Sequence, residues 1–345
     1  MNTMRFYISI AVGVVLALLG CELLLQLLPV NSGPRMETTS DAAPYTRYLP
    51  QQSMSYSFGW ALGNAHHSKI NRQGFNNSPD LQDNAKVLVI GDSFIESLML
   101  DQSQTVQGYL GASLHGGVYA ASASANGLAD SLQIARVFVP RIHPKNVVLF
   151  VEPTDVSGVL SPPLAGHSAF KTTTDGMTVV HHAYTESPAK MWALHSAVLR
   201  YAYYNLKLQE WFGSKFQSRN TPAPLDHETY ARNREAALRY YLEQLRLLGQ
   251  TRDVKFIFLL DGDRKAMYAN NRQGEKTWQG DDRAAFLAIV RQYGFDVADM
   301  QPVFERDWAL RRERLDFLPM DGHWNAVAHR LAAEQLLPLL VDAGR

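Results

Sequence analysis

The sequence predicts an α/β protein in which helices cover both faces of a central parallel sheet, preceded by one membrane-spanning helix. Short apolar runs at 86–90, 117–120, 147–151 and 254–260 alternate with segments of helical spacing, such as 128–139 and 230–248. Strands that alternate with helices along a chain pair in parallel, and their sheet is buried on both sides. The membrane helix is predicted by an unbroken apolar stretch at the start of the chain.

The overall composition is that of an ordinary globular protein without excess charge. Of 345 residues, 46% are hydrophobic and 19% charged, and 33 basic side chains balance 33 acidic ones. This length allows one large catalytic domain or two smaller ones. Proteins that bind nucleic acid usually carry a basic excess or patch, so no nucleic-acid partner is expected.

The apolar stretch from Phe6 to Leu28 has the length needed to cross a bilayer. We therefore interpret residues 1–30 as an N-terminal membrane anchor. Arg5 precedes the stretch, which places the short N-terminus in the cytoplasm and the chain after Pro29 outside it. The expected location is the bacterial inner membrane, with a single pass and the folded domain in the periplasm.

A cleaved signal peptide is the main alternative to an anchor. Leu18-Leu19-Gly20-Cys21 resembles a lipoprotein cleavage site with Cys21 as the lipidated residue, and simple cleavage is a second possibility. The apolar run continues from Leu23 to Leu28, which favours the uncleaved anchor. Cys21 is the only cysteine, so the outer domain has no internal disulfide, as suits a bacterial envelope protein.

The remaining chain divides into a linker and one domain. Residues 31–55 are polar and contain Ser, Thr, Pro and Gly, as in a linker that lifts a domain off the membrane. The domain is expected over 56–345, with an inserted cap at about 158–224. The cap contains a hairpin over 171–181 that turns at Asp175-Gly176, followed by an aromatic-rich helix over 189–212.

The first chemical motif is Gly91-Asp92-Ser93-Phe94, directly after the strand at 86–90. Open α/β sheets bind their ligands outside the carboxyl ends of the strands, where a helix begins. A serine at a helix N-terminus meets free N–H groups and partial positive charge, both of which favour a developing oxyanion. The alternative is a plain turn with a capping Asp or Ser.

The second motif is Asp321-Gly322-His323-Trp324-Asn325, just before a last helix that starts near Asn325. A serine hydroxyl is a weak nucleophile unless a base removes its proton, and a carboxylate fixes the tautomer of that base. Asp321 and His323 supply both groups. The alternative is an Asx turn with an N-cap at Asn325 and a surface histidine.

Together the two motifs resemble those of the SGNH or GDSL hydrolases, a family of esterases, lipases and carbohydrate acyl esterases. The resemblance spans about Asn71 to Leu340 and implies a three-layer α/β/α fold of the flavodoxin-like kind. It implies Ser93 as nucleophile, His323 as base and Asp321 as its partner. Gly91, Asp92, Asp155 and Trp324 are the expected supporting residues.

Family members build the oxyanion hole from the serine N–H, a glycine N–H and an asparagine side chain. The glycine block resembles Ala120 to Gly127, where the expected glycine falls at Ser122. The asparagine block resembles Glu152 to Asp155, with Thr154 in the place of Asn. The resemblance thus implies Ser93, Ser122 and Thr154 as donors, with Asn126 as the alternative to Thr154.

The spacing of Asp321 and His323, followed by Trp324, is similar to that in proteins that acetylate alginate in bacterial exopolysaccharide systems. This resemblance implies an esterase or acyltransferase that acts on O-acetyl groups of a polysaccharide, with an acylated carbohydrate and polysaccharide acetylation proteins as partners. No cofactor and no metal are expected; the pairs His66-His67 and His181-His182 lack a carboxylate at regular spacing. Alternatives are a catalytically degenerate polysaccharide-binding or scaffold protein, and a lipase or thioesterase.

Overall fold

The computed structural model describes residues 2–82, 85–174, 176–209, 227–268, 282–318 and 321–340. Its centre is a five-stranded, fully parallel sheet in the order β4-β3-β5-β8-β9. The strands are β3 (Val87–Gly91), β4 (Val118–Ser122), β5 (Asn146–Val151), β8 (Lys255–Leu260) and β9 (Asp296–Asp299). Counted along the sheet's own strands, this is the flavodoxin-like order 2-1-3-4-5.

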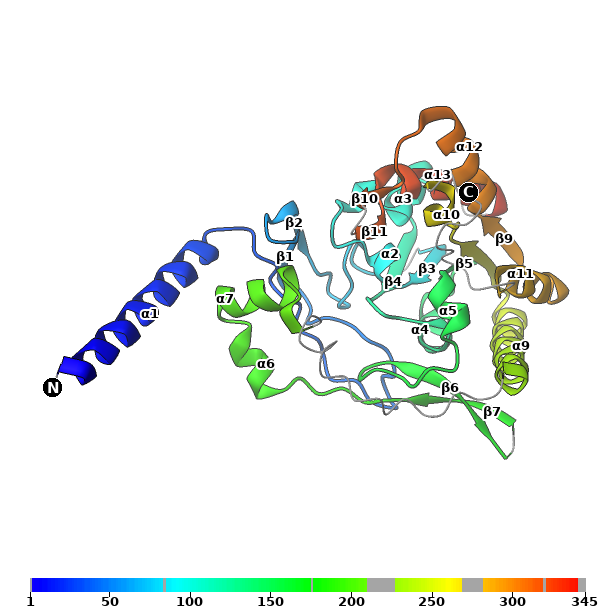
Figure 1. The fold of residues 1–345 in the computed structure, drawn as a ribbon. Coiled ribbons are helices and arrows are strands. Elements are labelled where there is room, and N and C mark those ends of the chain that lie inside the picture. The colour runs from blue at the N-terminus through cyan, green and yellow to red at the C-terminus, as the bar shows by residue number, and fades with distance from the viewer. Residues whose placement is uncertain are drawn as a thin grey trace.

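Helices cover both faces of this sheet, which confirms the predicted α/β fold (Figure 1). One layer contains α4 (Leu128–Ile142), α9 (His227–Arg252) and α11 (Asp282–Gln292), and the other contains α3 (Val106–Ser113), α12 (Gln301–Arg311) and α13 (Ala326–Leu336). Successive strand side chains point to opposite faces. Leu88 and Ile90 therefore pack against the first layer, and Val87 and Val89 pack against the second.

The N-terminal stretch forms α1 (Asn2–Gln26), which projects away from the domain (Figure 1). Its segment Met4–Gln26 is long and apolar enough to cross a membrane, a property that a signal sequence shares, and none of it is buried inside the protein. It is the one such helix within the part of the chain that the structure describes.

Residues 31–55 are not the free linker that their polar composition predicts. Tyr45 and Tyr48 are buried, and the Tyr45 ring stacks on Phe75 at a centroid distance of 6.5 Å. The Tyr48 N–H donates to the Gly74 carbonyl at 2.9 Å. The linker prediction was wrong because a few aromatic side chains supply the buried area that holds an otherwise polar segment on the domain.

A two-stranded antiparallel hairpin follows this segment and begins the domain slightly before residue 56. Its strands are β1 (Ser53–Phe58) and β2 (Gly63–Lys69). β2 is polar, and β1 alternates serine with Met54, Tyr56 and Phe58, so neither strand contains an apolar run.

The expected insertion contains the predicted hairpin, formed by β6 (Ser168–Thr173) and β7 (Gly176–His181). The single aromatic helix predicted next is instead three short pieces: α6 (Pro188–Ala193), α7 (Ala197–Arg200) and a π-helical turn over Tyr201–Asn205. Ser187 and Ser196 each cap the N-terminus of a new helix, which divides the segment. Residues 210–224 of the predicted cap, and Asp175 at the hairpin turn, lie outside the described residues.

Candidate active site

Ser93 lies at the carboxyl edge of the sheet, where β3 gives way to the one-turn helix α2 (Ser93–Glu96). The Asp92 carboxylate caps this helix and accepts the Phe94 N–H at 2.9 Å. A side chain at Gly91 would place its Cβ 2.4 Å from Ile95 and 3.0 Å from Phe150. Glycine is therefore required for the close approach of the turn to β5.

The structure brings Ser93, His323 and Asp321 together in one chain of hydrogen bonds. His323 Nε2 lies 2.8 Å from Ser93 Oγ, and His323 Nδ1 lies 2.6 Å from Asp321 Oδ1. With a carboxylate facing Nδ1, the neutral ring carries its hydrogen there and presents the Nε2 lone pair to the serine hydroxyl. This is the arrangement in which a histidine can take the proton of a serine nucleophile.

The buried carboxylate of Asp321 is held from both sides. Its second oxygen accepts a hydrogen bond of 2.9 Å from the Tyr56 hydroxyl on β1. Burial alone would raise the pKa of Asp321, but the hydrogen bond and charge of His323, together with the Tyr56 hydroxyl, hold it below its usual value. Tyr56 was not predicted as a site residue, because it lies 265 residues before Asp321 in the chain.

Asp321 and His323 belong to β11 (Asp321–Trp324), which pairs with β10 (Asp316–Leu318) instead of lying in an open loop. The Arg264 guanidinium donates to the Gly322 carbonyl at 2.6 Å and to Asp261 at 3.0 Å. Trp324, fully buried, donates from its indole N–H to the same Asp261 at 2.9 Å. Gly322 and Trp324 therefore anchor the strand on both sides of His323.

Asp261 and Arg264 were not predicted from the sequence, although a signal for them existed. Both directly follow β8, at the same carboxyl edge that identified Ser93. The Arg264 guanidinium also lies 5.3 Å from the centroid of the Phe94 ring, which packs against the His323 ring at 4.9 Å. Asp261 and Arg264 therefore hold the nucleophile turn and β11 in a fixed relative position.

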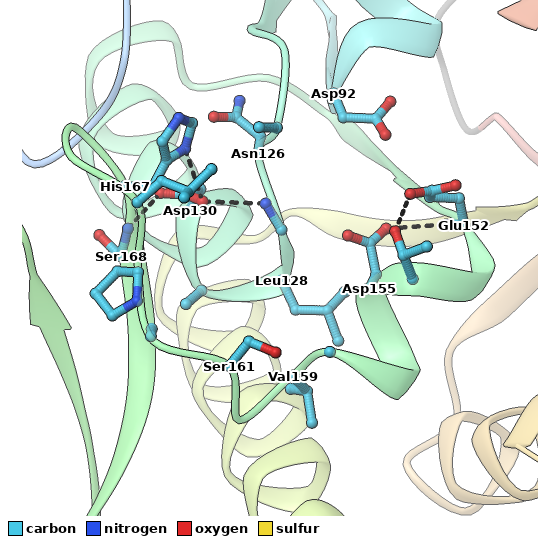
Figure 2. A pocket seen from close by; sticks show the side chains of 18 of the residues that line it. Asp92, Asn126, Leu128, Asp130, Glu152, Asp155, Val159, Ser161, His167 and Ser168 are labelled. Carbon is cyan, nitrogen blue, oxygen red and sulfur yellow. Dashed lines mark hydrogen bonds and ion pairs between the residues drawn. The ribbon is translucent and has the colours of Figure 1, made fainter. Parts of the chain in front are cut away.

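A cavity of about 380 Å³ opens beside Ser93 (Figure 2). Its wall includes Ala125, Asn126 and Gly127 from the loop after β4, and Glu152 and Asp155 from the start of α5 (Pro153–Ser157). Ala125 adopts a left-handed backbone conformation, with φ of 66°, so the loop bends sharply at this point.

The prediction that Ser122 lies at the oxyanion hole is contradicted. Ser122 is the last residue of β4, pairs with Gly91 in the sheet and is fully buried. It does not line the cavity, whereas Ala125 to Gly127, farther along the same loop, do. The alignment with the family placed the donor residue too early in the chain, because the loop continues past the end of β4 before it turns toward Ser93.

The two candidates for the third donor differ in what their polar atoms contact. Thr154 is exposed on the cavity wall, and its hydroxyl donates to the Glu152 carboxylate instead of facing Ser93. Asn126 is buried, lines the same cavity and donates one amide hydrogen to the Gly91 carbonyl at 3.0 Å. An amide nitrogen has two hydrogens, so Asn126 retains a donor next to the nucleophile turn. The geometry favours Asn126 over Thr154.

Several carboxyl groups lie on the cavity wall. Asp92, Glu152 and Asp155 all face it (Figure 2). Burial raises the pKa of Asp92, and the charges of Glu152 and Asp155 raise it further. Burial and the charge of Glu152 likewise raise the pKa of Asp155, and burial raises that of Glu152. This wall therefore disfavours negative charge in whatever binds beside Ser93.

A fourth carboxyl group, that of Glu96, lies fully buried at the end of α2. It accepts the hydroxyl hydrogen of Ser124, in the loop that carries Ala125 and Asn126. Burial, opposed by the bond from Ser124, raises the pKa of Glu96 to about 7. Glu96 thus links the nucleophile helix to the loop that lines the cavity.

Within the described residues, no group of three or more His, Cys, Asp or Glu side chains is placed to hold a metal ion. His67 contacts Ser55 at 2.9 Å, and His181 contacts Thr39 at 2.8 Å. Both histidine pairs therefore take part in the packing of residues 31–69 and the β6–β7 hairpin.

No protein-family model matches this sequence, and no curated protein matches it significantly. Solved structures that align with it include an acetyl xylan esterase, with 12% identity over 74% of this chain and 100% of that chain and a TM-score of 0.42. An acetylxylan esterase variant from Geobacillus stearothermophilus aligns with 13% identity over 77% and 98%, at a TM-score of 0.41. A putative lipolytic protein of the G-D-S-L family from Desulfitobacterium hafniense aligns with 12% identity over 74% and 100%, at 0.39.

The last of these proteins is described as a member of the family that the sequence motifs resemble. Similarity at this level does not carry an activity from one protein to another. The class of site is defined by its own atoms: a serine, a histidine and an aspartate in one hydrogen-bonded chain at the carboxyl edge of a parallel sheet.

Proposed function

We propose that this chain is a serine esterase or acyltransferase of the SGNH type that acts on O-acyl groups, O-acetyl groups above all, of a bacterial polysaccharide. The observation that supports it best is the short contact of His323 with both Ser93 and Asp321. A structural histidine needs neither a serine hydroxyl at its Nε2 nor a buried, doubly bonded carboxylate at its Nδ1.

In the proposed reaction, Ser93 Oγ attacks the acyl carbonyl carbon while His323 Nε2 takes the hydroxyl proton. Asp321 keeps the imidazole oriented and stabilises its positive charge. The tetrahedral intermediate then collapses, the bond to the sugar oxygen breaks, and His323 returns the proton to that oxygen. Water or a second sugar hydroxyl attacks the acyl-serine in the other half-reaction, which gives hydrolysis or transfer respectively.

The oxyanion of that intermediate needs donors on the cavity side of Ser93. We assign this role to the Ser93 backbone N–H and the Asn126 side-chain amide, because both border the cavity. Thr154 and Ser122 have no part in the proposal, since the Thr154 hydroxyl is bonded to Glu152 and Ser122 lies inside the sheet.

The cavity wall supports a sugar substrate over a long acyl chain. The carboxyl groups of Asp92, Glu152 and Asp155 can accept hydrogen bonds from sugar hydroxyls. The apolar groove that a lipase or thioesterase would need is found elsewhere, against α6 and α7, and none of its lining residues belongs to the triad. The acidic wall further supports a neutral sugar at this position, so acetylated xylan should react faster than acetylated alginate.

We further propose that α1 anchors the enzyme in the bacterial inner membrane, with the domain in the periplasm. The support is the length and apolarity of Met4–Gln26, none of which is buried inside the protein. Proteins that make or acetylate polysaccharide are the partners that this location would bring within reach.

The proposal is tested with a fluorophosphonate probe, which labels only activated serines. We expect labelling of the wild type and none of Ser93→Ala, with unchanged circular dichroism in both. Ser113→Ala is a matched control, because Ser113 is an exposed serine at the end of α3, outside the triad and the cavity wall, and it should label normally. An unlabelled wild type with intact fold would instead identify a binding or scaffold protein of the same fold.

A further inference from the structure

The C-terminal end of α1 is fixed to the inserted segment by its single acidic residue, Glu22. The Glu22 carboxylate accepts the N–H groups of Ala197 at 2.8 Å and Val198 at 3.0 Å, and the Ser196 hydroxyl at 2.8 Å. One turn farther on, the Gln26 amide donates to the His195 carbonyl at 3.1 Å. The first turn of α7 is therefore bound directly to the last two turns of the anchor.

These contacts set the depth of α7 relative to a membrane. Glu22 and Gln26 both lie inside the span Met4–Gln26. At a rise of 1.5 Å per residue, Glu22 is about 6 Å nearer the membrane centre than Gln26. If α1 crosses the bilayer, Glu22 and the N-terminus of α7 lie near the boundary between the hydrocarbon core and the lipid headgroups, and α6 lies beside α7 (Figure 1).

The segment held at this level exposes apolar side chains that a periplasmic surface would normally bury. Trp192 is 72% exposed, Tyr203 53% and Leu199 40%, and Leu206 and Leu208 are exposed as well. We call these five residues the α6–α7 surface. Next to them is a groove of about 650 Å³, lined by Leu199, Tyr203 and Leu208 among others. The three side chains that line this groove lie together on the surface, and such an exposed apolar patch indicates a binding face.

The composition of the α6–α7 surface and its surroundings fits lipid better than a protein partner. Trp and Tyr are enriched at membrane interfaces, where an apolar ring meets a polar edge. Arg200 borders the groove and has a long stem that can reach lipid phosphates. The surface also continues directly from the anchor, since Arg200 contacts Gln26 at 3.4 Å.

We propose that the α6–α7 surface lies in the interfacial layer of the membrane leaflet from which α1 emerges, as a second membrane contact. This inference depends on the proposed anchoring by α1. Two membrane contacts would then fix the orientation of the domain on the bilayer, whereas α1 alone would let the domain rotate.

The second contact also bears on the active site. Asn205, at the end of the π-helical turn, donates to the Ser57 carbonyl at 3.0 Å. Tyr201 of the same turn donates to the Trp60 carbonyl at 2.6 Å, at the tip of the β1–β2 hairpin. The adjacent Tyr56 holds Asp321. The hairpin therefore joins the membrane face to the triad, and it fixes the distance of Ser93 from the lipid surface.

The test uses the full chain, with Cys21→Ser, in vesicles of phosphatidylethanolamine and phosphatidylglycerol. Single cysteines at Trp192→Cys and Leu206→Cys carry a bimane label, and lipids with a spin label near the headgroup serve as quencher. Leu310→Cys is the matched control, because Leu310 is an isolated, 85% exposed leucine on α12. Val14→Cys, in the middle of α1, reports on the anchor itself.

We expect several-fold loss of fluorescence at positions 192 and 206, and little change at 310. Quenching at 14 by lipids labelled deep in the chain, without quenching at 192 and 206, would overturn the inference and leave the anchor intact. No quenching at 14 would overturn both. Labels at 192 and 206 that are protected only in native membranes, and not in vesicles, would assign the surface to a protein partner and reject lipid. Turnover of a small acetyl ester by each variant verifies that it has folded.

Discussion

The two sides of Ser93 are built in opposite ways. On the triad side, the acidic group is matched by donors: Asp321 has His323 and Tyr56, and its pKa is lowered. On the cavity side, Asp92, Glu152 and Asp155 crowd one another, and their pKa values are raised. The same residue type thus has two roles, which are decided by its neighbours and not by its identity.

This difference indicates which side is suited to proton transfer. A matched carboxylate stays ionised and keeps a histidine oriented, so the triad side is arranged before substrate arrives. A crowded set of buried carboxyl groups is costly for folding and is typical of sites that contact a ligand. The cavity side is therefore the place to look for substrate recognition, and each prediction below separates the two sides.

The largest effect is expected from Asp321→Asn. The amide keeps the shape but favours the wrong histidine tautomer, so turnover of an acetyl ester should fall roughly 10⁴-fold. The matched control on the cavity side is Asp155→Asn, which removes a carboxylate outside the triad and should change turnover far less. Equal losses in the two variants would remove the distinction between the sides.

The next effect concerns the oxyanion hole. Asn126→Ala removes the assigned amide donor, and turnover should fall by roughly 10²-fold to 10³-fold, the usual loss for one such donor. Thr154→Val removes a hydroxyl that is bonded to Glu152, so it should have little effect on turnover. The reverse ranking, measured as kcat on the same ester, would return the role to Thr154.

Part of the site could be predicted from the sequence, and part could not. Ser93, Asp321 and His323 were predictable because each lies at a strand end or before a helix, where position alone implies the carboxyl edge. Loops have no periodicity, so the sequence does not show which residue of the loop after β4 approaches Ser93. The sequence therefore predicted Ser122, whereas Ala125 and Asn126 line the cavity. Contacts across long separations, such as Tyr56 to Asp321, leave no local pattern at all.

Glu96 gives a prediction about pH and stability. Its pKa is raised from 4.5 to about 7 in the folded protein, so the folded state binds more protons than the unfolded state between these values. Stability should therefore fall as pH rises from about 4.5 to about 7, by at most about 3 kcal/mol from this group. Denaturant unfolding at pH 5 and pH 8 measures this, and Glu96→Gln should flatten the difference. An unchanged difference would show that other groups cause it.

A smaller effect is expected from Tyr56→Phe on the triad side. The substitution removes one hydrogen bond to a buried carboxylate, worth about 1.5 kcal/mol, so kcat should fall about tenfold. The rate should also depend on pH differently, because the pKa of Asp321 loses one of the contacts that lower it. Tyr119→Phe is a matched control, since Tyr119 is a buried tyrosine that packs with Phe75 and Phe138 and not with the triad, and it should leave the pH profile unchanged.

The most direct test of the account is to trap the acyl-enzyme. Wild type is mixed with a small acetyl ester, quenched with acid within the first turnover and digested, and the acetylated peptide is located by mass spectrometry. The account predicts acetyl on Ser93, absent from Ser93→Ala and strongly reduced in His323→Ala. Steady turnover with no acetyl on Ser93 would contradict the proposed mechanism, whatever the other variants show.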